Sequence, residues 1–126
     1  PDLIRAMEYI ECRENFSVVL GNDLLIAPGV LVGCDGAVSG NAQVAPELFV
    51  KLYEAAAAKD VETAVELQKK ATLVAKLLRN GGDLSLFKYG LAHRGVPVGD
   101  VRAPLKKVDP QEAAEIMAKI DELAVY

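Results

Sequence analysis

The stretch GVLVGCDGAVSGN, residues 29–41, decides which fold the sequence predicts. Its apolar run breaks at the turn Gly33–Gly36, resumes for a few small residues and stops at Gly40. A short apolar run of small residues between turn signals is typical of a buried strand, which we place at 37–39. A strand in this position needs a partner strand beside it.

A candidate partner strand lies directly upstream. FSVVL, residues 16–20, is a short apolar run that ends at Gly21. Between the two strands, residues 24–33 form an apolar helical stretch, which Asp23 could cap and which Pro28 should distort. Two strands joined through a helix predict a parallel βαβ unit.

Helices account for most of the remaining chain. Asp2 can cap a first helix that ends at about Arg13. After the second strand, each expected helix begins at a proline or a capping aspartate, and the four cover 46–59, 61–80, 84–94 and 110–124. Two strands cannot close a sheet, and a (β/α)8 barrel typically needs about 250 residues. The missing strands therefore lie on sequence outside this chain, or the chain pairs with another.

Composition and charge restrict the function. The 126 residues are 52% hydrophobic with a formal net charge of −4, which indicates one globular domain. The acidic balance argues against nucleic acid or an anionic membrane surface as a partner, because polyanions need a clustered positive field. No secretory signal and no apolar run of about 18 residues occurs, so we expect a cytoplasmic location and no membrane partner.

Cysteine and histidine provide no evident metal or redox site. Cys12 and Cys34 are outside any CxxC motif, and we expect both to be reduced, buried thiols. His93 is the only histidine and falls late in an expected helix, where a cation is favourable, so we interpret it as structural.

Four motifs follow one another along the chain: GND at 21–23, GCDGAVS at 33–39, NAQVAPEL at 41–48 and VRAPL at 101–105. In this order and spacing they resemble the C-terminal portion of the dihydrodipicolinate synthase and N-acetylneuraminate lyase family. The resemblance implies an α/β fold, the C-terminal part of a (β/α)8 TIM barrel, with 16–20 as strand seven and 37–39 as strand eight. Residues 1–58 would then be the last βα units and residues 59–126 a helical C-terminal extension.

The resemblance also implies a reaction. Family members condense or cleave pyruvate or related 2-oxo acids through a lysine that forms a Schiff base, whose iminium withdraws electrons from the substrate. In the family this lysine lies on the sixth strand, just upstream of the first helix of this chain. We expect none of the lysines present to stand at a strand end: Lys51, Lys59, Lys69, Lys70, Lys76, Lys88, Lys106, Lys107 and Lys119. We therefore assign no catalytic residue here, expect no metal and no cofactor, and expect this chain alone to be inactive.

Four residues match family positions that contact substrate. Gly21 and Asp23 follow the seventh strand, while Val38 and Gly40 lie on the eighth, close to the imine. Two simpler interpretations stay open: Asp23 is a favoured helix cap, and the two glycines could serve tight turns. Leu24 replaces an acidic residue that is common in the lyase branch, which disfavours sialic acid as the substrate.

The implied partners are a small 2-oxo acid, the N-terminal half of the barrel and further copies of the chain, since the family commonly forms homotetramers. An alternative function is a noncatalytic helical assembly module, whose exposed half-sheet is covered by another chain.

Overall fold

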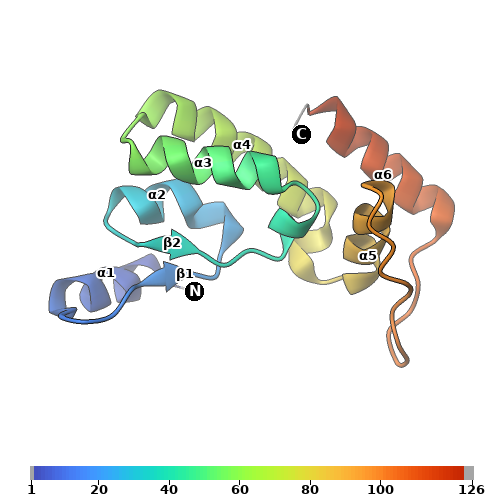
Figure 1. Cartoon of the computed structure of the whole chain (residues 1–126), viewed down its shortest axis with the longest axis horizontal. Helices are drawn as coiled ribbons and strands as arrows, with labels where there is room; N and C mark the ends of the chain where they lie inside the picture. Colours follow the sequence, from blue (N-terminus) through green and yellow to red (C-terminus); the bar gives the residue numbers. More distant parts are fainter. Residues whose placement is uncertain (1, 124–126) are drawn as a thin grey trace.

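The computed structural model describes residues 2–123, and Figure 1 shows an elongated molecule with a small βαβ unit near one end and helices over the remainder. The helices are α1 (Leu3–Cys12), α2 (Ile26–Leu31), α3 (Pro46–Ala57), α4 (Val61–Leu77), α5 (Leu84–His93) and α6 (Pro110–Glu122). The strands are β1 (Val19–Leu20) and β2 (Gly36–Ala37), and short 3₁₀ turns are η1 (Asp23–Leu25), η2 (Asn41–Gln43) and η3 (Arg79–Gly81). The predicted order of helix, strand, helix, strand and four helices is confirmed.

The two strands are adjacent and parallel, as the βαβ prediction requires. Val19 pairs with Gly36 and Leu20 with Ala37. Main-chain bonding continues past the ladder, because the N–H of Val38 donates to the carbonyl of Leu20 at 2.7 Å. Both strands are shorter than the predicted ranges of 16–20 and 37–39. Residues 2–123 contain no third strand, so each strand has one unpaired edge in this part of the chain.

The start of the second helix differs from the prediction. Asn22, and not Asp23, caps this segment: its side-chain oxygen accepts from the N–H of Leu24 at 3.0 Å and closes η1. Helix α2 then begins only at Ile26, where its N-cap residue Leu25 has no side-chain acceptor. Adjacent Asn and Asp are equally good caps, so the choice between them depends on contacts from elsewhere in the fold.

The other predicted caps are confirmed. Asp2, Asp60, Asp83 and Asp109 each accept hydrogen bonds from main-chain N–H groups in the first turn of their helices. Helix α4 ends at Leu77, earlier than the predicted 61–80, and the predicted end at Ala124 lies outside the described residues. None of the helices between residues 2 and 123 combines the length and the apolar character that crossing a bilayer requires.

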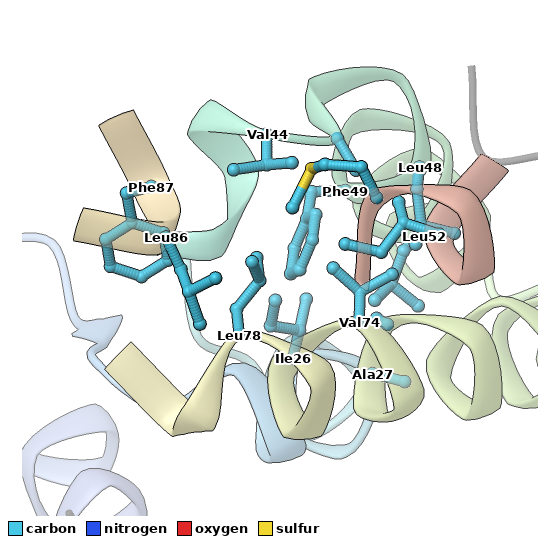
Figure 2. Packing of buried hydrophobic residues seen from close by; sticks show 14 of the residues in the cluster. Ile26, Ala27, Val44, Leu48, Phe49, Leu52, Val74, Leu78, Leu86 and Phe87 are labelled. Carbon is cyan, nitrogen blue, oxygen red and sulfur yellow. The ribbon is translucent and has the colours of Figure 1, made fainter. Parts of the chain in front are cut away.

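One large hydrophobic core joins α2 to the four later helices. In Figure 1, α3 and α4 lie side by side above α2, with α5 and α6 beside them at the other end. Figure 2 shows Phe49 and Leu52 of α3 facing Val74 and Leu78 across this core. Leu52, Val74 and Leu78 are fully buried. The predicted division at 58/59 falls in the turn between α3 and α4, and this core includes residues from both sides of it.

A second, smaller core holds the βαβ unit together. It consists of Ala6, Val18, Leu20 and Cys34. Helix α2 passes very close to β1 at Gly29, where an added Cβ would lie 1.9 Å from Cδ1 of Leu20. A larger residue at position 29 would therefore force the Leu20 side chain to move, which favours glycine where the helix approaches the strand.

Candidate functional site

Polar side chains gather where β1 and β2 end. Asn22 and Asp23 follow β1, and Ser39 and Asn41 follow β2. Because neighbouring parallel strands have their carboxyl ends at the same edge, these residues come together, and α/β barrels place their ligand sites at this edge. The contact is direct, since the Nδ2 group of Asn41 donates a hydrogen bond to the carboxylate of Asp23.

Asn41 is the most buried polar residue of this edge. Its side chain and main chain together are only 3% exposed. Its Oδ1 atom is buried and has no hydrogen-bond partner among the described residues. Turning the amide over would place Oδ1 against the Asp23 carboxylate, so the bond to Asp23 fixes the orientation of the side chain.

The two loops border a small hollow of about 140 Å³. It is lined by Gly21, Asn22, Asp23, Leu24, Asn41, Ala75 and Asn80. Ala75 belongs to α4, and Asn80 belongs to η3, where it has a left-handed backbone with φ 51°. The C-terminal end of α4 therefore forms one wall of the candidate site.

The structure brings together two of the four predicted site residues. Gly21 and Asp23 line the hollow, whereas Val38 and Gly40 are not among its lining residues. Val38 directly follows β2 and is 69% exposed. Gly40 is the N-cap residue directly before η2, and an added Cβ there would lie at an ordinary contact distance of 3.5 Å from the ring of Phe87.

The simpler interpretation of Asp23 as a helix cap is wrong, while tight turns stay a prediction for the two glycines, and Gly40 accepts a turn bond from the N–H of Gln43 at 3.2 Å. Asn22 caps η1, the N-cap residue of α2 is Leu25, and the Asp23 carboxylate bonds to Asn41 instead. Neither Gly21 nor Gly40 has a positive φ, so neither is required by a left-handed turn. An added Cβ at Gly21 would meet no atom within 4 Å.

Sequence reasoning missed two contributors to the site. The first is Asn80, for which the sequence RNGG offered a signal, because asparagine before glycine tolerates left-handed backbone. The second is Gln68 of α4, whose Nε2 donates to the main-chain carbonyl of Asp23 at 2.8 Å. No local pattern marks a glutamine in the middle of a helix for this contact.

Other reactive side chains lie outside the hollow. Cys34 is buried as predicted, and its pKa is raised mainly by this burial and further by the charge of Asp35. Cys12 is exposed, which corrects the prediction, because it ends α1 on the side away from the small core. His93 ends α5 as predicted, with Nε2 3.0 Å from Asp121 of α6.

Among residues 2–123, the strand ends carry neither a lysine nor a cluster of potential metal ligands. Within residues 2–123, every lysine lies on a helix, in a turn between helices or in the loop before α6. The same part of the chain contains no group of three or more His, Cys, Asp or Glu residues placed to hold a metal ion.

Comparison with known proteins identifies relatives of this chain. Residues 2–123 match the family described as the dihydrodipicolinate synthetase family. A DapA-like lyase of Halobacterium salinarum is 36% identical over 116 residues, which are 92% of this chain and 38% of the relative. 4-Hydroxy-tetrahydrodipicolinate synthase 1 of Streptomyces coelicolor is also 36% identical, over 89% of this chain and 37% of the relative.

A solved structure has the same fold over nearly the whole chain. The 2-keto-3-deoxygluconate aldolase of Sulfolobus solfataricus superposes with a TM-score of 0.86 at 26% identity, covering 98% of this chain and 42% of the aldolase. The chain thus spans about two fifths of the length of the proteins that it matches, and its helices and paired strands have the fold of part of these barrel enzymes. This chain belongs to the dihydrodipicolinate synthetase family.

Proposed function

We propose that this chain is the C-terminal portion of a Schiff-base-forming lyase or synthase that acts on pyruvate or a related 2-oxo acid. In this proposal β1 and β2 are barrel strands seven and eight, residues 1–58 complete the barrel, and residues 59–126 form a helical extension. The observation that carries it is the hydrogen bond between Asp23 and Asn41, at the common carboxyl edge of two parallel strands. The relatives contribute the reaction class by their names, which are those of a lyase, a synthase and an aldolase.

The covalent step belongs to a lysine upstream of this chain. Its amine adds to the keto carbon of the 2-oxo acid and water leaves, and the resulting iminium stabilises negative charge on the neighbouring carbon. The residues at the carboxyl ends of β1 and β2 bind and orient the substrate. Gly21 leaves its main chain open to approach, and Asp23 offers a carboxylate that Asn41 holds in place. Val38 and Gly40, which follow the end of β2 and lie outside the hollow, are placed close to the imine in this proposal.

The sheet surface supports an upstream half of the barrel as the partner that covers it. Val19 and Val38 are 53% and 69% exposed, although both lie at the strand pair. Burying such side chains stabilises a fold by about 1.5 to 3 kcal/mol each, so a neighbouring strand and helix layer would add substantially to stability. The matched relatives are long enough to supply that layer, since this chain covers 38% of the first of them.

A second copy of the chain is the proposed partner of another surface. An apolar groove of about 510 Å³ runs between α2 and α4, and Leu31, Val65 and Leu73 on its walls are 36%, 44% and 47% exposed. Helix α4 is acidic in its first half, at Glu62 and Glu66, and basic later. Its basic positions are Lys69, Lys70 and Lys76. An antiparallel contact between two α4 helices around a two-fold axis therefore pairs opposite charges beside a shared apolar seam.

Trapping with borohydride tests the reaction class. The longer protein that contains this chain should gain the mass of a reduced pyruvate adduct when pyruvate and sodium borohydride are added together. This chain alone should gain none, and borohydride without pyruvate is the control. A longer protein that forms no adduct would contradict the proposal and favour the noncatalytic assembly module. Its substrate beyond the 2-oxo acid and its cytoplasmic location remain predictions from the sequence.

A further inference from the structure

Gln68 links α4 to the loop that carries Asp23. Its side chain is half-buried in the middle of α4, and it reaches a segment that lies more than 40 residues earlier in the chain. The Nε2 group donates to the main-chain carbonyl of Asp23 at 2.8 Å, and Oε1 accepts from the N–H of Ala27 at 2.9 Å. Nε2 also lies 3.4 Å from Oγ1 of Thr72, one turn further along α4.

These contacts determine which way the amide of Gln68 faces. If the amide were turned over, Oε1 would face the carbonyl oxygen of Asp23 and Nε2 would face the N–H of Ala27, so both bonds would be lost. A side chain with one donor and one acceptor at the same end is therefore required at this position. Leucine or methionine offers neither group, and an ionised glutamate offers acceptors only.

The acceptor half of Gln68 replaces a missing helix cap. The first N–H groups of a helix have no partner within the helix, and Leu25 before α2 has no side-chain acceptor. Oε1 of Gln68 provides an acceptor for one of these groups, that of Ala27. Helix α2 is thus capped from α4, and its start is fixed by tertiary structure.

The donor half of Gln68 acts on the candidate site. Asp23 is held at two points: its carbonyl by Gln68 and its carboxylate by Asn41. The same helix α4 lines the hollow with Ala75, and Asn80 follows it. The position of the Asp23 carboxylate relative to this wall therefore depends on the bond from Gln68.

We propose that Gln68 is a positioning residue of the substrate site, which fixes the Asp23 carboxylate by bonding its main chain to α4. The effect on substrate rests on the proposed function, while the effect on the loop does not. Gln68 also lines the groove between α2 and α4, so the oligomeric state of each variant is measured alongside.

Hydrogen exchange of this chain tests the loop. Gln68→Met removes both bonds, Gln68→Glu keeps an acceptor for Ala27 but loses the donor to Asp23, and Thr72→Val leaves both bonds in place. The Ala27 amide should exchange about tenfold faster in Gln68→Met, as expected for the loss of one hydrogen bond, and at the parent rate in Thr72→Val. In Gln68→Glu the Ala27 amide stays protected. The side-chain amide resonances of Asn41 shift in both Gln68 variants but not in Thr72→Val.

Kinetics of the longer protein test the substrate site. Gln68→Glu should raise KM about tenfold for the substrate that reacts with the pyruvate adduct. Formation of the pyruvate adduct under borohydride should stay within twofold of that in the unsubstituted longer protein, the parent. Unchanged Ala27 exchange in Gln68→Met would overturn the inference whatever the reaction is. If the exchange results hold but the parent protein forms no adduct, the proposed function fails and the structural link stands. If the parent forms the adduct and Gln68→Glu leaves KM unchanged, the positioning role is wrong.

Discussion

Replacing Gly29 with alanine tests how closely α2 packs on the sheet. The new Cβ would lie 1.9 Å from Cδ1 and 3.2 Å from Cγ of Leu20, and 3.7 Å from Sγ of Cys34. Carbon atoms in contact are separated by about 3.5 to 4.0 Å, so the Leu20 side chain must move by about 2 Å. Leu20 is only 5% exposed and belongs to the small core, which leaves it little room to do so.

The expected cost combines two opposing effects. Overpacking a well-filled core typically costs about 1 to 3 kcal/mol. Alanine gains about 1 kcal/mol over glycine inside a helix, which offsets part of that cost. We therefore expect Gly29→Ala to lower the free energy of unfolding by about 1 kcal/mol. In a Leu20→Ala background the clash is absent, so the same substitution should raise the free energy of unfolding by about 1 kcal/mol.

Urea unfolding of the four proteins in this double-mutant cycle, followed by circular dichroism, measures both effects. Gly21→Ala is the control, because its Cβ would meet no atom within 4 Å and its φ is not positive. It should leave stability unchanged or raise it by about 0.5 kcal/mol. The reasoning is refuted if Gly29→Ala changes stability equally in both backgrounds.

Three further predictions concern charge, thiols and self-association. The bond from Arg94 lowers the pKa of Glu47 from 4.5 to about 2, so the stabilisation by the ionised carboxylate is present above pH 4.5 and is lost as the pH falls towards 2. In Glu47→Gln the free energy of unfolding, measured with urea, should therefore depend less steeply on pH in that range. An unchanged pH slope would contradict this. Cys12 should react with a thiol reagent in the folded chain and Cys34 only on unfolding, as peptide mapping of the labelled protein would show; early labelling of Cys34 would be inconsistent with its burial. Leu73→Glu should convert the associated chain to monomers in sedimentation velocity, and an unchanged sedimentation coefficient would exclude the groove as the interface.

Local signals in the sequence predicted most helix starts. Asp60, Asp83 and Asp109 each stand directly before a helix and bond to its first turn, so the cap and the groups that it satisfies lie within a few residues of each other. The parallel pairing of β1 and β2 could also be predicted, because a helix between two short apolar runs leaves few other topologies.

Long-range contacts account for what the sequence did not reveal. The choice between Asn22 and Asp23 as the cap depends on Asn41, which the fold brings to Asp23 from 18 residues away. The acceptor for α2 comes from Gln68 on a different helix. Cys12 was expected to be buried from its residue type alone, but α1 buries only Ala6 among its described residues.

The position of the trapped adduct tests the central claim most directly. After pyruvate and borohydride treatment of the longer protein, proteolysis and mass spectrometry locate the modified lysine. The proposal predicts one modified peptide that lies upstream of residue 1 and whose lysine ends a strand beside β1. A reduced adduct on a lysine within residues 1–126, such as Lys51 or Lys88, would contradict it.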